Sequence, residues 1–279
     1  MMLSEITNSE KQIFIFIDGS YYCFYRYYAL LNWWKNAYPE QPLENPIENP
    51  VFVDKFKKTF IENLQQLPVK LKLDKNIKHI LIAAKDCKRE NIWRNELFPK
   101  YKETRVHDDK FMGGPFFKMV YEDKLFEQGG AKIILNHKHL EADDCVAITV
   151  NQVLKKHPDS MIYIIASDRD YLQLQSSNVK IMNLMYKNIA ENKSSTGNAE
   201  KDLQIKIIMG DVSDNIPSVF PKCGPKTALK CCEDKVFFEK KMGSKKYYYD
   251  QYNLNEQLVS FKKIPENLAE EFIINNLQK

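Results

Sequence analysis

Leu140-Glu141-Ala142-Asp143-Asp144-Cys145 is the stretch around which the chain is organised. Residues 132–135, just before it, form an apolar run that predicts a strand, and residues 145–157 have the period of an amphipathic helix. Three carboxylates in four positions, with no nearby Lys or Arg, repel one another unless they bind a cation. Oxygen ligands at this density are typical of Mg²⁺ or Mn²⁺ sites. The stretch alone leaves two interpretations open, a metal site or an acidic helix cap.

Further apolar runs predict a buried parallel sheet. Residues 13–17 are β-branched and aromatic, which suits a strand covered on both faces. The other expected strands are residues 79–84, 132–135, 161–166 and 179–185, and the expected helices are residues 21–34, 52–67, 115–128 and 145–157. This alternation predicts an α/β fold with a central, mostly parallel sheet flanked by helices.

Acidic residues follow the ends of four of these runs. They are Asp18, Asp86, Glu141, Asp143, Asp144, Asp168 and Asp170. A single acid at a strand end is consistent with an ordinary turn. Four such ends favour a shared site, because ligand sites of open α/β sheets lie at the carboxyl edge of the strands.

The remaining segments suggest two regions. Residues 39–50 are rich in proline and predict an irregular loop, and the polar residues 190–201 predict a mobile one. Residues 99–128 predict an arch or lid over the site. The sequence after residue 201 is mostly helical. We therefore expect an α/β core over residues 1–190, including the lid, and a helical region over residues 202–279.

The composition is that of an ordinary globular protein. Of the 279 residues, 44% are hydrophobic and 28% are charged, and the net charge is +4. The six cysteines have neither a Cys-x-x-Cys pair nor a zinc-binding spacing, which predicts free thiols in a reducing compartment. No signal-peptide core and no apolar run of transmembrane length is present. We expect a protein that is not secreted, in the cytoplasm, the nucleus or a site of viral replication.

Two further motifs complete a family resemblance. They are Gly210-Asp211-Val212-Ser213-Asp214-Asn215-Ile216-Pro217 and Trp93-Arg94-Asn95-Glu96-Leu97-Phe98-Pro99-Lys100-Tyr101-Lys102. Together with the acidic strand ends, in order from Ile13 to about Cys232, they resemble the flap endonuclease and 5′–3′ exonuclease family. The chain is most similar to the phage 5′ nucleases and to the 5′ nuclease domain of bacterial DNA polymerase I. The resemblance implies a PIN-like nuclease core.

This resemblance also implies a centre of two Mg²⁺ ions, for which Mn²⁺ would substitute. One ion would lie among Asp18, Asp86, Glu141 and Asp143. The second would lie among Asp143, Asp168, Asp170 and Asp214, with Asp144 and Asp211 in supporting positions. Two such ions activate a water and stabilise the leaving oxygen of a phosphodiester.

Basic and aromatic residues are the expected substrate contacts. Lys102 is the candidate catalytic cation over the scissile phosphate, and Arg94 and Arg105 would hold flanking phosphates. Tyr21 and Tyr22 follow the first acid, where the family stacks an aromatic ring on a base, although aromatic rings on a helix are more often core. Arg26 resembles the family's arginine in this helix but lies one position further along.

A second motif resembles the helix–three-turn–helix that grips duplex DNA. Gly224 and Pro225 precede a predicted helix, whose free N–H groups would hold a phosphate. Lys226, Thr227 and Lys230 would contact the same strand. The family often binds a K⁺ ion here with a Gly-Ile-Gly segment, where this chain has Lys-Cys-Gly. An ordinary Gly-Pro turn is the alternative interpretation.

These features predict a metal-dependent, structure-specific 5′ nuclease of replication and repair. Its partner would be DNA with a junction between a 5′ single strand and a duplex, or RNA-primed DNA. We expect a monomer that contacts other replication proteins. A catalytically silent junction-binding protein is one alternative, disfavoured by the full set of acids. A PIN-like ribonuclease is another, disfavoured by the predicted duplex clamp.

Overall fold

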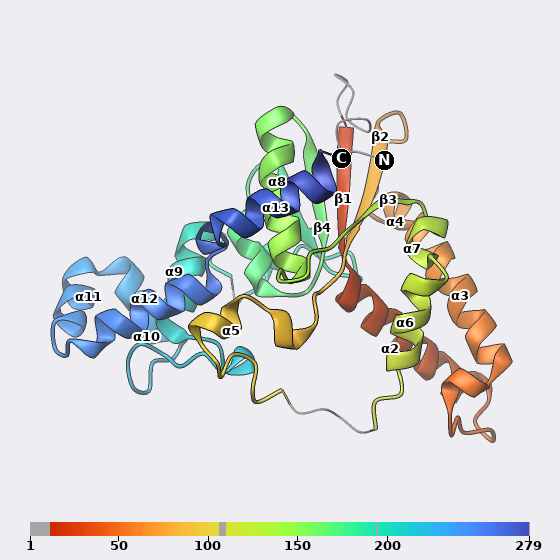
Figure 1. Cartoon of the computed structure of the whole chain (residues 1–279), viewed down its shortest axis with the longest axis horizontal. Coiled ribbons are helices and arrows are strands. Elements are labelled where there is room, and N and C mark those ends of the chain that lie inside the picture. The colour runs from red at the N-terminus through yellow and green to blue at the C-terminus, as the bar shows by residue number, and fades with distance from the viewer. Residues whose placement is uncertain (1–11, 106–109, 194, 279) are drawn as a thin grey trace.

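The computed structural model describes residues 12–105, 110–193 and 195–278 of the chain (Figure 1). These residues form an α/β fold with one five-stranded sheet, all of whose strands are parallel, in the order β3-β2-β1-β4-β5. The strands are β1 (Gln12–Asp18), β2 (Lys78–Ala84), β3 (Ala131–Leu135), β4 (Met161–Ile165) and β5 (Val179–Met182). The predicted strands are thus confirmed, except that the last one ends three residues earlier than expected.

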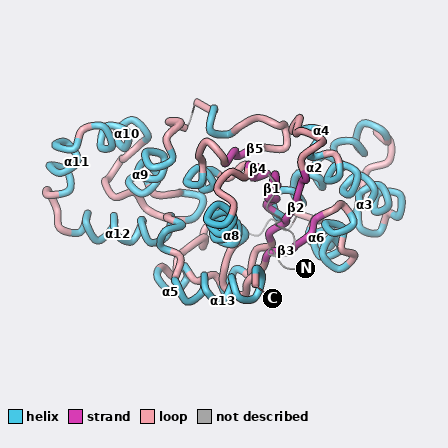
Figure 2. The backbone as a smooth tube through the Cα atoms, turned by 90° about the horizontal axis from the view of Figure 1, so that it is seen from above, coloured by secondary structure: helices cyan, strands magenta, loops and turns pink. Residues whose placement is uncertain are grey.

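Helices cover both faces of the sheet, with the magenta strands between them in Figure 2. One face carries α2 (Gly19–Ala37), α3 (Pro50–Gln65), α4 (Leu67–Lys70), α6 (Gly114–Glu122) and α7 (Leu125–Gln128). The other carries α8 (Ala142–Lys156) and α13 (Glu266–Leu277), near the short α5 (Arg94–Leu97). The helices α9 (Ala199–Met209), α10 (Pro225–Glu233), α11 (Lys235–Met242) and α12 (Tyr247–Val259) extend to the left in Figure 1.

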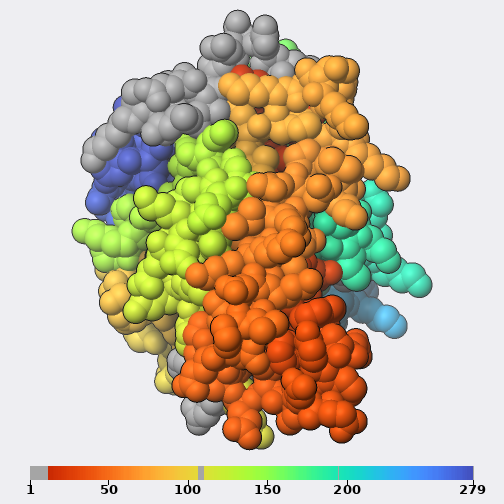
Figure 3. Space-filling view, turned by 90° about the vertical axis from the view of Figure 1, so that its right-hand side faces the viewer, coloured from red at the N-terminus to blue at the C-terminus, as the bar shows by residue number. Residues whose placement is uncertain are grey.

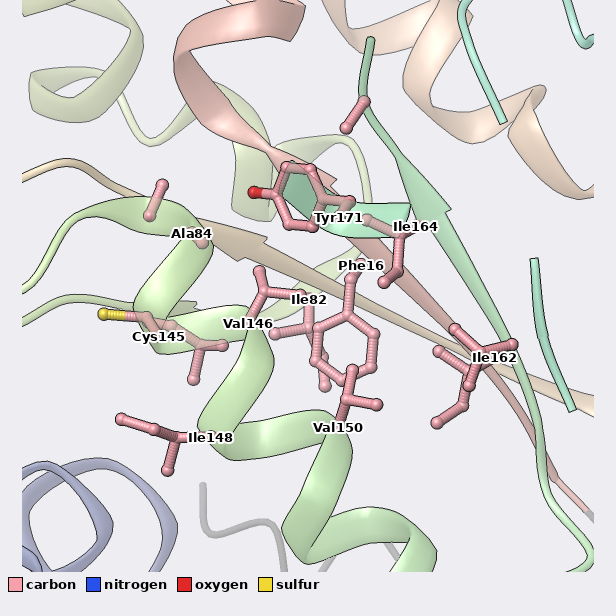
Figure 4. Packing of buried hydrophobic residues seen from close by; sticks show 14 of the residues in the cluster. Phe16, Ile82, Ala84, Cys145, Val146, Ile148, Val150, Ile162, Ile164 and Tyr171 are labelled. Atoms are coloured by element: carbon pink, nitrogen blue, oxygen red, sulfur yellow. The ribbon is translucent and has the colours of Figure 1, made fainter. Parts of the chain in front are cut away.

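The side chains of β1 show why the sheet is buried on both faces. Phe14 and Phe16 belong to the cluster beneath α8, whereas Ile13, Ile15 and Ile17 belong to the cluster beneath α2 and α3. Successive side chains of a strand point to opposite faces, so a continuous apolar run can fill two cores. Figure 4 shows Phe16 among the side chains that α8 lays against the sheet.

The helix α3 illustrates how local sequence sets an element. Asn49 caps it by accepting a hydrogen bond from the amide of Phe52, and Pro50 occupies its first turn. Its buried residues Phe52, Phe56, Phe60 and Leu64 are four apart, so they form one apolar stripe. The orange surface in Figure 3 shows the opposite face of this region, which is turned outward.

The expected arch over residues 99–128 needs a correction. Residues 114–128 are not a lid, because Phe116, Val120, Leu125 and Phe126 are buried in the cluster beneath α2 and α3. The single helix predicted over residues 115–128 is also divided into α6 and α7 by a turn at Lys124, whose φ is 55°. That turn directs both Leu125 and Phe126 into the core. Residues 106–109 of the expected arch lie outside the described residues.

The predicted loop over residues 190–201 is likewise more ordered than expected. Ser195 and Thr196 donate hydrogen bonds of 2.5 and 2.7 Å to the carboxylate of Asp202, and Asn198 caps α9. In the helical region, α13 packs on α8, and its Phe272 and Leu277 join the core of the sheet. Part of residues 202–279 therefore completes the α/β core. Among the described residues, no helix is both long and apolar enough to cross a membrane.

The strand order fixes where a ligand can bind. The chain runs outward from β1 through β2 to β3, then returns to β4 on the other side of β1 and ends at β5. The winding therefore reverses between β1 and β4, and open α/β sheets bind ligands outside the strand ends at such a point. Asp18 ends β1 and Asp168 follows β4, so both acids flank this crevice.

A buried ion pair fastens α5 to the start of α8. The guanidinium of Arg94 donates to both oxygens of Asp144, at 2.8 and 2.7 Å, and its Nε donates to the carbonyl of Leu258. Trp93 adds a bond of 3.0 Å from its indole to Asp144. Arg94 is 2% exposed and Asp144 is fully buried, so each charge depends on the other.

We predict that Arg94→Met lowers the free energy of unfolding by about 3–5 kcal/mol, because it leaves the carboxylate of Asp144 buried without a cationic partner. Urea denaturation measures this change. The double variant Arg94→Met/Asp144→Leu should recover much of the loss, since it removes both charges.

The surface substitution Lys58→Met is the control. Lys58 pairs with Glu62 across one helical turn and its side chain is 70% exposed, so its loss should cost under about 1 kcal/mol. Equal small losses for Arg94→Met and Lys58→Met would contradict a stabilising role for the buried pair.

Candidate metal centre and substrate pocket

Four carboxylates without a cationic partner converge on one pocket. Asp18, Asp86, Asp143 and Asp168 line a cavity of about 360 Å³ at the switch point of the sheet. Within the described part of the chain, none of the four forms an ion pair. The structure thus brings together acids from four strand ends that are far apart in sequence, as the sequence predicted.

Asp18 is held rigidly at the end of β1. Its Oδ1 accepts the amide of Tyr21 at 2.9 Å, capping α2, and its Oδ2 accepts the hydroxyl of Tyr171 at 3.0 Å. Burial raises the pKa of Asp18 to about 7, and the neighbouring charge of Asp86 adds to the shift. A cation in the pocket would lower that pKa again, because it favours the charged form of the carboxyl group.

Gly19, the next residue, explains how α2 can begin so close to β2. A Cβ at Gly19 would stand 2.4 Å from the carbonyl oxygen of Ala84 and 2.6 Å from the hydroxyl of Tyr121. Only glycine fits there without displacing the strand. The first residue of α2 therefore keeps Asp18 next to Asp86, whose own Oδ1 accepts the amide of Ala142 at 2.8 Å.

The start of α8 supplies the other acids. Ligand oxygens of Glu141, Asp143 and Asp144 lie within 4.8 Å of one another, but both oxygens of Asp144 are bonded to Arg94. Asp144 is therefore less suited to bind a metal directly than Asp143. Burial raises the pKa of Asp143 well above its usual value, and Asp144 and Glu141 raise it further. The predicted helix over residues 145–157 begins three residues earlier, so that Asp143 and Asp144 lie in its first turn.

The expectation that no Lys or Arg neutralises these acids was wrong. Arg94, Lys102, Arg105 and Lys206 form ion pairs with Glu141, Asp144, Asp170, Asp211 and Asp214. The sequence did not reveal these ion pairs, because the cations lie on other segments that only the fold brings close to the acids. Arg89 also lines the acid pocket, so nine carboxylates and five cations leave a formal charge of −4 at this edge.

Lys206 is a residue that sequence reasoning missed. From α9 its ammonium contacts Asp170 and lies 2.9 Å from Asp211, although burial opposes its charge. These acids hold the pKa of Lys206 above its ordinary value, and Lys206 holds that of Asp211 below its own. A lysine inside an ordinary helix gives no sequence signal of such a position. Gly210 sets the turn before Asp211, since its φ is 70° and a Cβ would meet the carbonyl oxygen of Ile216 at 2.3 Å.

Lys102 lines the acid pocket and is only partly exposed. Its ammonium contacts Glu141 and lies 3.7 Å from Asp214, while its amide donates to the carbonyl of Asp214 at 2.9 Å. Burial opposes the charge, but Glu141 and Asp214 keep the pKa of Lys102 above its usual value. The residue adopts a left-handed backbone with φ of 56°, a conformation that occurs at functional sites.

The two predicted arginines differ in accessibility. Arg105 is half exposed, lines the pocket and bonds Asp214 at 2.5 Å. Arg94 is buried, and its guanidinium is bonded to Glu141, Asp144 and a backbone carbonyl. The expected phosphate contact by Arg94 is therefore corrected, because in this structure Arg94 fixes the acids from inside. Tyr101 assists it by donating toward Glu141 and Asp214.

The aromatic residues after Asp18 also separate into two groups. Tyr21 lines the acid pocket, and its hydroxyl accepts the amide of Leu184 at 3.0 Å. Tyr22 is fully buried, with its ring edge-on to Phe60, so the expected base contact by Tyr22 is corrected to a core role. Arg26 lies on the side of α2 that faces Tyr186, and its Nε is buried without a hydrogen-bond partner.

The expected duplex clamp lies away from the acids, at the start of α10. Gly224 is its N-cap, and Lys226 and Lys230 are both exposed, with Thr227 between them. The ammonium of Lys230 lies 4.3 Å from the centre of the Phe237 ring. The start of α10 is thus a basic surface.

Known proteins are similar in sequence to most of this chain. The family described as 5'-3' exonuclease, N-terminal resolvase-like domain matches residues 13–204. A 5'-3' exonuclease of Buchnera aphidicola subsp. Acyrthosiphon pisum (strain APS) is 31% identical over 223 residues, which are 77% of this chain and 68% of that protein. The ribonuclease H of Enterobacteria phage T4 is 31% identical over 215 residues, 69% of this chain and 68% of that one.

The fold has a solved counterpart as well. A structure of the T5 5'-exonuclease with divalent zinc ions bound superimposes with a TM-score of 0.64 at 17% identity, over 95% of this chain and 98% of that one. That likeness shows the fold, and the family match spans the residues that include Asp18, Asp86, Asp143 and Asp168. The chain therefore belongs to the 5'-3' exonuclease family, with its N-terminal resolvase-like domain over residues 13–204.

Proposed function

We propose that this protein is a structure-specific 5′ nuclease that uses two divalent metal ions. It would hydrolyse phosphodiester bonds at 5′ flaps and 5′ ends, in DNA replication and repair. The observation that supports this most is the set of four acids, Asp18, Asp86, Asp143 and Asp168, that line one pocket and form no ion pair with the residues that the structure describes. The family membership supports the nuclease chemistry.

The charge of the pocket explains why metal ions are needed. A phosphodiester carries a negative charge, and the formal charge of −4 at this edge would repel it. Two divalent ions would bring that charge to zero. Carboxylate oxygens suit Mg²⁺, with Mn²⁺ as a substitute. Such ions supply a nucleophilic hydroxide at neutral pH and stabilise the leaving oxygen.

The donor set fits the first ion better than the second. Among the described residues, Asp18, Asp86 and Asp143 form no ion pair. Glu141, the fourth expected ligand, is bonded to Lys102, Arg94 and Tyr101. For the second ion, Asp143 and Asp168 are unpaired. Its other two expected ligands, Asp170 and Asp214, are bonded to Lys206 and Arg105, so that ion would compete with these side chains.

Lys102 and Arg105 are the proposed phosphate contacts. Both line the pocket and both are bonded to acids that the metal ions would claim. A phosphate in the pocket offers them a second anionic partner. Lys102 would then stabilise the charge that develops in the transition state.

The exposed start of α10 is the proposed duplex contact. Lys226 and Lys230 would neutralise phosphates of one strand, and the N-terminus of α10 at Gly224 and Thr227 would add backbone N–H groups. A K⁺ ion in the preceding turn belongs to this proposal. Contacts of this kind do not read base sequence, so an RNA primer on DNA is also a proposed substrate.

The central experiment presents the protein with a 5′-labelled flap, a nicked duplex and an RNA-primed duplex. We predict cleavage in Mg²⁺ or Mn²⁺ and none in EDTA. Asp143→Asn should lower the rate more than about 100-fold, because it replaces a charged ligand. Product lengths measured on denaturing gels distinguish flap cleavage from release of 5′ ends.

Asp159→Asn is the matched control, because Asp159 is exposed in a turn away from the pocket. It should cleave at the rate of the unmodified protein. Undiminished cleavage in EDTA would rule out the metal mechanism. Binding of the flap without any cleavage in either metal would favour a silent junction-binding protein, and a preference for single-stranded RNA would favour a PIN-like ribonuclease.

Loss of Lys102 should appear in the rate of cleavage and not in affinity. Lys102→Met keeps the aliphatic stem and removes the charge, so we expect a loss of about 10²–10³-fold in single-turnover rate. Dissociation constants measured in Ca²⁺ should change little.

Lys100→Met is the comparison, two residues away. Lys100 is exposed whereas Lys102 is mostly buried, so thermal unfolding of both variants must show that each is folded. Equal small rate losses would mean that Lys102 is only part of a basic surface.

The stabilisation that Mg²⁺ gives should increase between pH 6 and pH 8. The pKa of Asp18 is raised to about 7, so without metal its contribution to stability is present below its unfolded pKa near 4 and is lost as the pH rises through 7. A metal ion displaces that proton and binds more tightly as the pH rises. Thermal unfolding with and without Mg²⁺ measures this stabilisation at each pH. Asp18→Asn should make the stabilisation less dependent on pH. A shift of equal size at pH 6 and pH 8 would contradict this linkage.

A further inference from the structure

A second cavity lies at the end of α2 that is farther from the sheet, where the chain turns toward α3 (Figure 1). Its volume is about 500 Å³, which is larger than the 360 Å³ of the acid pocket. Cavities of about 300–1,000 Å³ are typical of ligand sites. We call it the α2–α3 pocket. No residue that lines the acid pocket lines it, so the two are separate sites within the described chain.

The α2–α3 pocket is apolar and carries positive charge. Aromatic rings, three prolines and the aliphatic side chains of Leu31, Leu43 and Met112 line it. Among the described residues of the lining, the charged ones are Lys35 and Lys110, and none is an Asp or a Glu. The buried centre of a protein–protein interface has this composition, rich in aromatic residues and Met and poor in acids.

Local hydrogen bonds and prolines fix the loop that forms one wall of this pocket. The indole of Trp34 donates to the carbonyl of Gln41 at 2.8 Å, and the amide of Gln41 donates to the carbonyl of Tyr38 at 3.0 Å. The three prolines restrict the backbone of the same loop, and one of them, Pro46, is buried. The pocket is therefore formed before a ligand binds, which reduces the entropy lost on binding.

The arrangement of the rings favours a bulky side chain over stacked bases. Tyr27 and Trp34 are 2% and 5% exposed, and Phe111 meets Tyr27 edge-on, at an interplanar angle of 77°. The ring of Tyr38 lies 4.4 Å from that of Trp34, measured between centroids. These rings cover one another, whereas a base needs an open ring face on which to stack. Ring edges beside aliphatic side chains instead suit an apolar side chain that enters the pocket.

The two lysines indicate the polar part of the ligand. Lys35 is exposed in the last turn of α2, and Lys110 comes from the segment before α6. Because both belong to the lining, a ligand in the pocket has cations beside it and no carboxylate of the lining to repel its own. Complementary charge at the rim of an interface steers the partner and fixes its register. The ligand should therefore carry acidic groups next to its apolar side chain.

We propose that the α2–α3 pocket binds a short acidic segment of a partner protein. One bulky apolar side chain of that segment enters the pocket, and its carboxylates lie beside Lys35 and Lys110. The cations select an anionic ligand, and the covered ring faces distinguish a peptide from a nucleic acid strand. This inference does not depend on the proposed nuclease function, because no residue of the acid pocket takes part in it.

The test measures the affinity of labelled decapeptides by fluorescence anisotropy. One set places a pair of bulky apolar residues, varied over Leu, Ile, Met, Phe and Trp, between aspartates. A second set has lysine in place of every aspartate, and a third has an alanine pair in place of the apolar one. We expect the best acidic peptides to bind at least about tenfold more tightly than their counterparts in either other set. Equal affinities across the three sets would overturn the proposal.

Lys35→Glu and Met112→Glu locate the binding. Both residues are exposed, so the fold should persist, and thermal unfolding checks this. Each variant should weaken the acidic peptides at least about tenfold, because it adds a carboxylate to the lining. Lys35→Glu should also bind the lysine peptides more tightly than the unmodified protein does. Acidic peptides that bind both variants as well as the unmodified protein would show a different site and would overturn the assignment to this pocket.

Two matched variants serve as controls on the other face of the sheet. Lys156→Glu changes an exposed lysine in the last turn of α8, as Lys35→Glu does in α2. Ile274→Glu changes an exposed apolar residue of α13 and matches Met112→Glu. Both controls should bind the acidic peptides as the unmodified protein does. A loss in the controls equal to that in Lys35→Glu and Met112→Glu would mean that only the net charge of the protein matters.

Two measurements examine the other occupants of the pocket. A labelled oligothymidylate should bind Met112→Glu and Ile274→Glu equally, and a selective loss with Met112→Glu would show that the pocket holds nucleic acid. Light scattering should give the same mass for the unmodified protein and Met112→Glu. A dimer that Met112→Glu converts to a monomer would show that a second copy of the chain fills the pocket. Either result would overturn the peptide as the ligand.

Discussion

Repulsion among carboxylates gathered at one edge of a sheet is the constraint on which the rest of this structure depends. The strand order brings the acids there, and the folded state is stable only if other groups offset their negative charge. Arg94 does so permanently, since it is buried and bonded to both oxygens of Asp144. Lys102, Arg105 and Lys206 do so with side chains that are more accessible than that of Arg94. The site thus contains one fixed counter-ion and several exchangeable ones.

The buried counter-ion Arg94 serves the stability of the fold, whereas the acids that it leaves unpaired are available for chemistry. Asp144 is committed to Arg94 and holds the first turn of α8 in place, which positions its neighbour Asp143. Asp143 and Asp18 remain without cations in the described structure, and burial raises the pKa of both. A protein that keeps such groups desolvated and unpaired loses stability for it. That loss is understandable if a divalent ion binds there, because the ion converts the repulsion into binding energy.

The sequence predicted the parallel sheet and the convergence of its acids because both follow from local patterns. An apolar run that ends in an acid is visible within a few residues, and parallel strands share one edge. The ion pairs were not predictable in the same way. Arg94 and Asp144 are 50 residues apart, and Lys206 and Asp170 are 36 apart, so only the tertiary fold brings them together. The burial of Tyr22 and the division of the predicted helix at Lys124 also depend on tertiary packing.

The helix α2 shows both what a local sequence pattern predicts and what only tertiary packing decides. Its buried side, with Tyr22 and Tyr27, packs in the core, and its open side carries rings that no core requires. The sequence shows an aromatic run but cannot tell the sides apart, because core and stacking surfaces use the same residues. Exposure separates them, since Phe24 and Tyr28 remain open although apolar neighbours lie within reach. An open ring at Tyr28 has an energetic cost in water. The tertiary fold, and not the residue type, therefore decides which rings of α2 are core and which stay open.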